Sequence, residues 1–496
     1  MKTLYRNRFI ALFFLGIIAA PGCKKQLDIN VSPNNLSPEQ ATPSLVLPGA
    51  MMATAAVVGG DYAIIGAIWG EYAAQNNSSN QYRSTDGYTI GTTDYNRPYN
   101  TSYVKALKNY QFIIDKSAEQ NNWALNLMAT VMKAYTMEVL VDLYDKVPYT
   151  EALQGAGNIF PHADDGYTIY KDLLAKIDAA LAKPYTNISL ADAPSDLIFQ
   201  GNMDNWLRFA NTLKLKMYLR MINAKPAEAQ AGATPLLTAK LLTVDAKIAG
   251  FTDAPGKDNP LYEQNIRQLN TKENLKASVT LVSYLNANND PRGLYIYEYV
   301  SGTSTTIPAG IHQGDYTSAT TAYPAGIWRL RQRPTDPVVF ISAAETQFLL
   351  AEGLERYAAG VGAKAAYDAG VAASFAAMGI SGAATFTGPG GAYAYPVAGT
   401  LDQKFNALFT QKWISDAYGV HFLEGFFDHN RTGYPKNSPV YSDQPGYIPG
   451  QWVISRNSSL NAGKMPKRLA FPDSERSTNP NAPALVAIDV PVWWSL

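Results

Sequence analysis

Apolar side chains recur every three or four residues along much of this chain, and that spacing predicts α-helices. The apolar stripes cover 103–114, 123–144, 167–181, 206–221, 338–357 and 363–378. Amphipathic helices that follow one another across loops predict antiparallel helical hairpins stacked on each other. The last two stripes are similar to a tetratricopeptide unit, whose repeat is about 34 residues. Because the repeat is degenerate and the loops are long, we predict a mainly α, irregular tetratricopeptide-like scaffold of helical hairpins.

Two of these stripes have side-chain patterns that predict their packing. The 206–221 stripe has a polar side with Arg208, Lys214, Lys216 and Arg220. In the 363–378 stripe, Ala366, Gly370 and Ala373 are small enough to let two helix backbones approach closely.

The segment 44–75 is rich in small and apolar residues, and it predicts two core helices broken at Gly59-Gly60. The next segment, 76–100, has no apolar period and carries four tyrosines among Asn, Ser, Thr, Asp and Gly. It therefore predicts a long loop, and long loops in compact domains often carry function. Proline and glycine make 253–337, 385–400 and the chain after Arg431 loop-rich, with short strands at most.

The amino terminus has the pattern of a secretory signal. Lys2, Arg6 and Arg8 precede a short apolar run at 9–20, and Pro21-Gly22 follows it. The run is too short to span a bilayer. We therefore predict a signal peptide over 1–22.

The residue directly after the predicted signal peptide is Cys23, the only cysteine in the chain. A lone thiol in an exported protein forms no internal disulfide and is exposed to oxidation. Ala20-Pro21-Gly22-Cys23 resembles a bacterial lipobox, in which the cysteine takes a diacylglycerol and becomes the new amino terminus. We predict lipidation at Cys23, an extended tether over 23–40 and one large domain over 41–496. The alternative is a plain secreted protein with an incidental cysteine.

Composition narrows the class of partner. The 41 basic residues balance 41 acidic ones, so the charge does not indicate nucleic acid or an anionic lipid surface as a ligand. Only 17% of residues are charged, while 31 are tyrosine. Tyrosine joins a flat apolar face to a hydrogen-bonding tip, which suits wet recognition surfaces.

Motifs for catalysis and metal binding are missing from the sequence. Among the four histidines there is no His-Glu-x-x-His motif, and neither a phosphate-binding loop nor a Gly-x-Ser-x-Gly elbow occurs. The best metal candidate is His421, Glu424 and Asp428 with His429 beside them, but the phenylalanines around them indicate a packed helix end. We therefore expect no metal, no catalytic residue and no cofactor, with calcium left open at oxygen-rich turns such as 253–259.

Several short motifs, in order along the chain, resemble the SusD/RagB family of outer-membrane nutrient-binding lipoproteins. They are Leu27-Asp28-Ile29-Asn30 with Pro33-Asn34-Asn35, the 206–220 helix WLRFANTLKLKMYLR, Asn289-Asp290-Pro291-Arg292, the 337–352 segment PVVFISAAETQFLLAE, Gln411-Lys412-Trp413, Arg431-Thr432-Gly433-Tyr434-Pro435, and Pro466-Lys467-Arg468 with Phe471-Pro472, Glu475 and Asn479. Each motif alone is weak, but seven in family order are a specific match. The variable loops, which hold the ligand in that family, depart from its pattern.

Two of the motifs also have a direct structural interpretation. Pro291 disfavours helix at Asp290, so this turn ends a helix and leaves Arg292 free to bridge to carbonyls or a carboxylate. Gly433 permits a positive φ, and we expect Arg431 to tie that turn to the body. We interpret both arginines as structural, not as ligand-binding.

The resemblance implies a function. Such proteins lie as a surface lid over a SusC-like TonB-dependent transporter in the outer membrane, bind an oligosaccharide or, in some members, a peptide, and pass it into the barrel. We expect this chain to do the same, anchored to the membrane by lipid with its body in water. Two alternatives stay open: a binder of peptides or other non-sugar nutrients, and a glycoside hydrolase, which needs only two suitably spaced carboxylates.

No family motif dictates the ligand contacts, so we predict them from composition. Sugar recognition needs flat aromatic faces with polar groups beside them, and both crowd 76–100 and 312–329. The predicted ligand-binding residues are Tyr82, Arg83, Tyr88, Tyr99, Tyr316, Tyr323 and Trp328.

Overall fold

The computed structural model describes residues 41–186, 192–299, 309–319, 323, 327–461 and 463–495. The chain divides into two units, 1–42 and 43–496. The predicted signal peptide, Cys23 and the tether lie outside the described residues.

The second unit begins with a long core helix. It runs through α2 (Pro43–Ala56), the π-helical segment η1 (Val57–Asp61) and α3 (Tyr62–Trp69). The predicted break at Gly59-Gly60 is therefore wrong, because the chain stays helical there and widens by a π-turn. Val338 lies only 2.6 Å from the point where a Cβ on Gly59 would stand, so the glycine is needed for close packing. Among the described residues this helix alone is long and apolar enough to cross a membrane, but 83% of its most apolar window is buried inside the protein.

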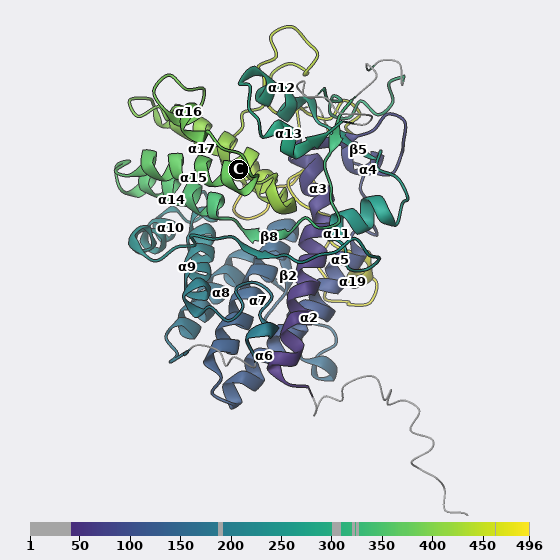
Figure 1. Cartoon of the computed structure of the whole chain (residues 1–496). Coiled ribbons are helices and arrows are strands. Elements are labelled where there is room, and N and C mark those ends of the chain that lie inside the picture. The colour runs from purple at the N-terminus through teal and green to yellow at the C-terminus, as the bar shows by residue number, and fades with distance from the viewer. Residues whose placement is uncertain are drawn as a thin grey trace, which may run out of the picture. The chain divides into compact units, whose positions relative to one another are not determined.

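Helical hairpins form most of the body, which confirms the predicted fold class (Figure 1). In its lower part lie α6 (Lys108–Glu119), α7 (Trp123–Tyr144), α8 (Gly166–Leu181) and α9 (Met203–Arg220). These four helices form a first group. A second group of helices contains α14 (Ala343–Tyr357), α15 (Ala363–Ala377), α16 (Ala383–Thr387), α17 (Leu401–Ser415) and α18 (Leu423–Thr432). At Gly370 the Phe348 ring of α14 lies 2.8 Å from the position of an added Cβ, so this glycine sets the close approach of α14 and α15.

Short strands join distant parts of the chain. A four-stranded antiparallel sheet has the order β1 (Ala73–Gln75), β5 (Leu275–Ala277), β7 (Arg329–Leu330) and β6 (Tyr297–Glu298), with Ala73 opposite Ala277. Two antiparallel pairs join β2 (Lys146–Pro148) to β3 (Ala163–Asp165) and β4 (Ala246–Ile248) to β8 (Val338–Ile341). The sheet holds the loop-rich middle of the chain against the first helix.

The predicted loop at 76–100 also contains two short helices, α4 (Arg83–Asp86) and α5 (Asn96–Thr101). Helices of four and six residues are too short to show an apolar period, which is why the sequence pattern missed them. The remaining described elements are η2 (Ser102–Leu107), η3 (Gly155–Gly157), η4 (Ala193–Ser195), α10 (Pro226–Ala233), η5 (Thr234–Thr238), α11 (Pro260–Tyr262), η6 (Glu263–Arg267), α12 (Val279–Ala287), α13 (Gly293–Ile296), η8 (Tyr418–Val420) and α19 (Asp473–Arg476).

Charged side chains are buried where five helices meet. We call the following set the buried charge network: Glu138, Asp142, Lys216, Arg220, Glu345, Glu352, Lys412, Asp416, His421, Glu424, Asp428 and Arg431. Two of its members, Lys216 and Arg220, were predicted on the polar side of their helix. They do lie opposite the apolar stripe, but that side faces Glu424 of α18, with N–O distances of 2.8 and 2.6 Å. A polar stripe on a predicted helix does not show whether its residues face solvent or a buried, oppositely charged partner.

Glu424 is paired with two cations of the network, Lys216 and Arg220. Burial acts to raise its pKa, but Arg220 and Lys216 outweigh that effect and hold the pKa well below its usual range. Arg431 similarly binds Glu352 at 2.6 Å and Asp428 at 2.9 Å. This confirms that Arg431 ties the 431–435 turn, with Gly433 at φ 73°, to the body.

The network has more carboxyl groups than cations, and the difference is made up by protonation. Burial raises the pKa of both Glu138 and Asp416 to about 8, so each holds a proton at neutral pH. Burial acts to lower the pKa of His421, but Glu345 outweighs that effect and raises the pKa above its usual range, which favours the protonated imidazole. The carboxylates of Asp142, Glu345, Glu352, Glu424 and Asp428 then face the basic groups of Lys216, Arg220, Lys412, His421 and Arg431, and Arg356 binds Glu352 from the edge of the network at 2.8 Å.

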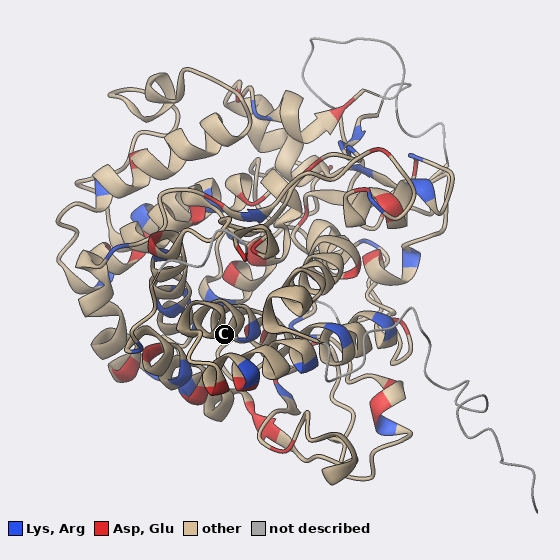
Figure 2. Cartoon of the chain, turned by 60° about the horizontal axis from the view of Figure 1, so that its bottom comes forward, with Lys and Arg blue, Asp and Glu red and all other residues tan. Residues whose placement is uncertain are grey.

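Outside this network both signs of charge are interspersed, without a face of one sign in the view of Figure 2. The Asp290–Arg292 turn is a smaller buried pair, with an N–O distance of 2.6 Å, and Arg292 also donates to Gln411 and Ser374. Both arginines that were interpreted as structural are therefore buried in contacts within the protein.

The protonated state of Glu138 predicts how stability depends on pH. Its folded pKa lies above its unfolded pKa, so the folded state binds more protons between about pH 4.5 and 8, and the free energy of unfolding falls as pH rises through that window. Glu138→Gln keeps the protonated shape and removes this term. We expect the variant to gain stability relative to wild type as pH rises, at about 1.4 kcal/mol per unit of pKa difference.

Urea unfolding of both proteins at pH 5, 7 and 9 measures the effect. Glu119→Gln, at the exposed end of α6, is the matched control and should change little with pH. A stability difference between Glu138→Gln and wild type that is independent of pH would contradict the assignment.

Candidate functional site

Three segments that are far apart in sequence, 75–88, 312–316 and 455–459, form one cluster of loops beside the first helix. We call it the loop cluster. Asp86 of α4 joins two of them, because its carboxylate accepts hydrogen bonds from the Gln75 amide at 3.0 Å, the Gln313 side chain at 2.9 Å and the Gly314 amide at 3.1 Å. Asn457 adds the third segment by donating to the Gly314 carbonyl at 2.6 Å. Burial raises the pKa of Asp86 to about 7. The two stretches that the sequence selected as ligand-binding are thus held side by side.

Two further hydrogen bonds fix α4 on the body. The Trp69 indole of α3 donates to the Thr85 carbonyl at 2.9 Å, and the Tyr82 amide donates to the Gln75 side chain at 2.6 Å. These contacts set the position of the Tyr82 ring at the start of α4.

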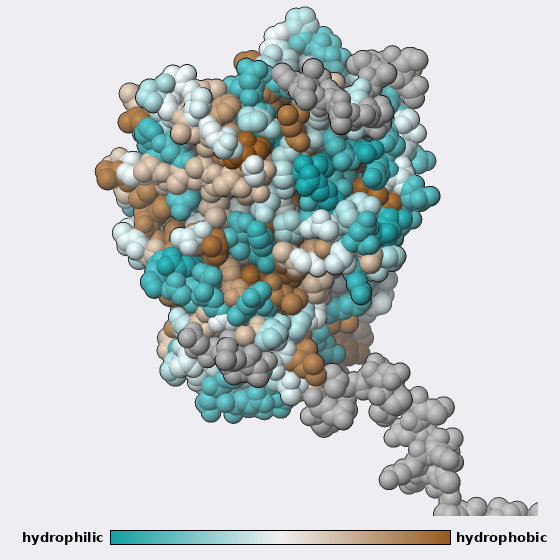
Figure 3. Space-filling model, viewed as in Figure 1, coloured by the Kyte–Doolittle hydropathy of each residue, from teal (hydrophilic) through white to brown (hydrophobic). Residues whose placement is uncertain are grey.

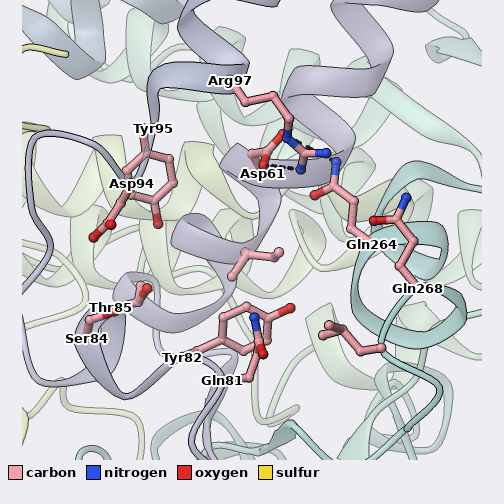
Figure 4. Close-up of a pocket in the computed structure, with 12 residues that line it drawn as sticks. Asp61, Gln81, Tyr82, Ser84, Thr85, Asp94, Tyr95, Arg97, Gln264 and Gln268 are labelled. Atoms are coloured by element: carbon pink, nitrogen blue, oxygen red, sulfur yellow. Dashed lines mark hydrogen bonds and ion pairs between the residues drawn. The ribbon is translucent and has the colours of Figure 1, made fainter. Parts of the chain in front are cut away.

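A cavity of about 420 Å³ opens where this loop meets η6, and we call it the polar pocket. Figure 4 shows the Tyr82 and Tyr95 rings on one side and two amides, Gln264 and Gln268, on the other. Its other lining residues are Asp61, Ile64, Gln81, Ser84, Thr85, Asp94, Arg97 and Leu269. Amides, hydroxyls and carboxylates around two tyrosine rings can hydrogen-bond a neutral ligand rich in hydroxyl groups.

An ion pair forms one wall of the polar pocket. Arg97 binds Asp61 at 2.6 Å, and the Gln264 side chain donates to the same carboxylate at 3.3 Å. Burial raises the pKa of both Tyr82 and Tyr95, so their hydroxyls stay protonated at neutral pH. The pocket therefore presents neutral donors beside two carboxylates, of which Asp61 is paired with Arg97 and Asp94 accepts a hydrogen bond from the Gly91 backbone amide at 2.8 Å.

The predicted ligand-binding residues fall into two groups. Tyr82 is 8% exposed but lines the polar pocket, while Arg83 is exposed and its guanidinium lies 5.6 Å from the Tyr316 ring centroid. Tyr88, Tyr99 and Trp328 are at most 4% exposed and are not among the residues that line the polar pocket. Rings so deeply buried present no face to a ligand in this conformation, because they pack the loops onto the body.

The packing partners of these buried rings are specific. Tyr99 lies 4.9 Å from Tyr103 and makes an edge contact with Tyr144 at 5.3 Å. Trp328 contacts Tyr299 at 5.7 Å between ring centroids. The Tyr88 hydroxyl accepts a hydrogen bond from the Ser455 amide.

Tyr323 belongs to a second aromatic group at the loop cluster. Its ring lies 6.0 Å from His312, whose ring is also 6.0 Å from Tyr441. The Arg456 guanidinium lies 4.2 Å from the Tyr441 centroid and binds Asp315 at 3.0 Å. The direct partners of Tyr323, His312 and Asp315, lie in the same stretch that the sequence selected. The sequence gave no sign of Tyr441 and Arg456, which come from a segment more than 100 residues away.

The metal candidate is a packed helix end with its charges paired. Glu345, His421 and Glu424 are the described residues whose ligand atoms come within 4.8 Å of one another, and all three belong to the buried charge network. Lys412 and Lys216 already pair with the two carboxylates. His429 lies apart, with its ring stacked on Trp452 at 4.1 Å, and burial lowers its pKa to about 3.

Several residues of the polar pocket were missed from the sequence. Gln264 and Gln268 follow a proline in a region interpreted as loop-rich, and Asp61 ends the π-helical segment of a core helix. No local pattern marks these residues, because only the packing of η6 against the first helix brings them to Tyr82.

An irregular scaffold of helical hairpins with a polar pocket under its loops is the architecture of a ligand-binding protein. The chain matches the SusD-like family, described as starch-binding and associating with the outer membrane, over residues 34–472. The chain therefore belongs to this family. A comparison with curated proteins finds no match.

Solved structures share the fold. A SusD homologue from Bacteroides uniformis is 22% identical, with a TM-score of 0.72 over 91% of this chain and 99% of its own. A chitin-binding SusD homologue from Flavobacterium johnsoniae is 21% identical, with a TM-score of 0.71 over 91% and 98%. A SusD-like protein from Bacteroides thetaiotaomicron is 22% identical, with a TM-score of 0.71 over the same shares.

The role of Asp86 predicts that its loss loosens the loop cluster. Asp86→Asn keeps the shape but turns an amide donor toward backbone N–H groups, so we expect a loss of about 1–3 kcal/mol in unfolding free energy. Amide hydrogen exchange at 312–316 should accelerate at the same time. Asp115→Asn on the exposed side of α6 is the control. Unchanged exchange at 312–316 in Asp86→Asn would rule out this role.

Proposed function

We propose that this chain is an outer-membrane surface lipoprotein that binds an oligosaccharide in the polar pocket and delivers it to a SusC-like TonB-dependent transporter. The observation that carries the proposal is the pairing of two tyrosine rings with amides and a carboxylate in one cavity of a SusD-like fold. The family description as starch-binding supports a glycan. So does the chitin-binding homologue of the same fold from Flavobacterium johnsoniae.

The chemistry of the polar pocket favours a sugar over an ionic ligand. A pyranose ring has an apolar face for Tyr82 or Tyr95 and hydroxyls that exchange hydrogen bonds with Gln264 and Gln268. The volume of about 420 Å³ lies in the range of about 300–1,000 Å³ typical of small-molecule sites. We assign binding, not catalysis, to this pocket.

Residues beside the polar pocket extend the proposed site. Arg83, which is exposed, and Tyr316 and Tyr323, which are half-buried, lie on the loop cluster and are proposed to contact further sugar units of a longer chain. Tyr88, Tyr99 and Trp328 are proposed to hold the loops in place instead. The face in Figure 3 mixes hydrophilic and hydrophobic residues, which suits a surface that meets both water and a partner.

Lipidation of Cys23 supplies the proposed membrane attachment. One acyl chain holds only marginally, at roughly 0.8 kcal/mol per buried CH₂, so lasting attachment needs the two or three chains of a bacterial lipoprotein. The body then stays in water, close to the transporter.

The site assignment predicts the effect of removing each pocket amide. Gln264→Ala and Gln268→Ala each remove hydrogen bonds worth about 0.5–1.5 kcal/mol, so each should weaken oligosaccharide binding about twofold to tenfold. Calorimetric titration of residues 24–496 with maltooligosaccharides and chitooligosaccharides measures this. Gln120→Ala, an exposed glutamine at the end of α6, is the matched control.

The same titrations distinguish the alternatives. Glycan binding that both pocket variants leave unchanged would place the site elsewhere. Binding of oligopeptides without any glycan would indicate a peptide carrier. Release of reducing sugar by the purified chain would indicate a glycoside hydrolase.

The anchor predicts the location of a cysteine variant. Cys23→Ser should move the protein from the membrane fraction to the soluble fraction, and mass spectrometry of the wild-type amino-terminal peptide should show acyl chains on Cys23. Ser32→Ala in the tether is the control and should remain in the membrane fraction. An unmodified thiol on membrane-purified protein would contradict the proposal.

A further inference from the structure

A second cavity, of about 320 Å³, lies among α6, α7 and α8 and shares no lining residue with the polar pocket. Figure 1 shows these three helices in the lower part of the body, away from α4. Its apolar lining comes from Ile114, Trp123, Ala134, Leu173, Ala179 and Ala180, and we call it the hairpin cavity.

A lysine is buried in the wall of the hairpin cavity. Lys133 of α7 is 8% exposed, and its ammonium donates to the Gln111 side-chain oxygen. Within the described part of the chain, no carboxylate oxygen lies within 4 Å of it. The buried lysines of the charge network differ, because Lys216 and Lys412 each bind a carboxylate within 3 Å. An ammonium buried without a counter-ion is costly, and an anionic ligand would remove that cost.

Two further lysines line the hairpin cavity beside aromatic rings. Lys183 lies 4.7 Å from the Trp123 ring centroid, and Lys176 lies 4.8 Å from that of Tyr149. The nearby carboxylate of Asp172 is taken, because it pairs with Lys176 at 2.6 Å and accepts a hydrogen bond from the Tyr149 hydroxyl at 2.5 Å.

The other acidic group near Lys133 is also occupied. Asp115 of α6 accepts a hydrogen bond from Gln111 at 2.8 Å. The hairpin cavity therefore has three lysines, Lys133, Lys176 and Lys183, and only two carboxylates nearby, Asp172 and Asp115. Neither carboxylate forms an ion pair with Lys133.

We propose that the hairpin cavity is a second binding site, for a small organic acid with an aromatic or aliphatic body. The carboxylate pairs with the Lys133 ammonium, and the body lies against Ile114, Leu173 and Trp123. A monocarboxylate fits better than phosphate, because the cavity offers one buried ammonium and a mainly apolar wall. A neutral sugar fits poorly, since it would leave Lys133 without a counter-ion. The site is independent of the proposed glycan function.

Three probes of matched shape test the proposal on the full mature chain. By calorimetry or ligand-observed NMR, 3-phenylpropionate should bind at least tenfold more tightly than 3-phenyl-1-propanol, and 3-phenylpropylamine should not bind. Maltooligosaccharides should not compete. Equal binding of acid and alcohol, or no binding of the acid, would overturn the proposal without any variant. Displacement of the acid by equimolar inorganic phosphate would overturn the choice of a carboxylate.

A lysine variant tests the ion pair. Lys133→Met keeps the length of the side chain and should abolish the preference for the acid over the alcohol. Lys171→Met, an exposed lysine on α8 outside the cavity, should leave it unchanged. Because Lys133→Met removes a buried charge, its melting temperature should equal or exceed that of wild type, so lost binding is separable from unfolding.

The pH dependence of binding gives an independent readout. Burial, with a smaller contribution from Lys176, lowers the pKa of Lys133 to about 8, and Asp115 and Asp172 oppose that effect. Burial also raises the pKa of Tyr149, which stays neutral over this range. Affinity for the acid should therefore fall as pH rises from 7 to 10, while affinity for the alcohol stays constant. An acid affinity that is flat over this range would contradict pairing with Lys133.

Discussion

The buried charge network is the interaction on which the rest of the structure depends. It joins α7, α9, α14, α17 and α18 at one point, and burial raises the pKa of two of its carboxyl groups, Glu138 and Asp416, to about 8, which lowers the negative charge that the network holds at neutral pH. Removing one partner of a buried pair costs about 3–5 kcal/mol, because the other charge stays behind without water. Arg431 shows the extent of that coupling, since it binds both Glu352 and Asp428, and these carboxylates in turn bind Arg356 at 2.8 Å and Lys412 at 2.7 Å.

A rigid body of this kind positions the loops around the polar pocket. The polar pocket lies between the first helix, α5 and η6. Its loops are held together by hydrogen bonds to buried side chains such as Asp86 and by buried rings such as Tyr88. Loops carry binding residues well when a rigid scaffold positions them. Gln264 and Gln268 line the polar pocket and are not members of the network, so substitutions at these residues are expected to leave the network intact.

The helices were predictable because an apolar stripe is a local property, whereas the contacts between them are not. The stripe at 123–144 became α7 with the same bounds, but the glycines at 59 and 60 were misinterpreted as a break. A glycine makes both a turn and a close helix contact possible, and only Val338 on β8 decides between them. The abundance of tyrosine did not identify the residues that line the pocket, for the same reason. Tyr82 and Tyr99 stand in similar sequence surroundings, but Tyr82 lines the polar pocket and Tyr99 packs against Tyr103 and Tyr144.

The motifs that resemble the family explain why the fold was predictable and the ligand was not. The 206–220 helix supplies Lys216 and Arg220, the 337–352 segment supplies Glu345 and Glu352, and the last motifs supply Lys412 and Arg431. These six residues are half of the twelve that form the buried charge network, so the motifs describe the body and not the polar pocket. Asp61, Gln264 and Gln268 belong to no motif. A resemblance built on buried charges therefore specifies a scaffold, and the cargo has to be identified from the pockets.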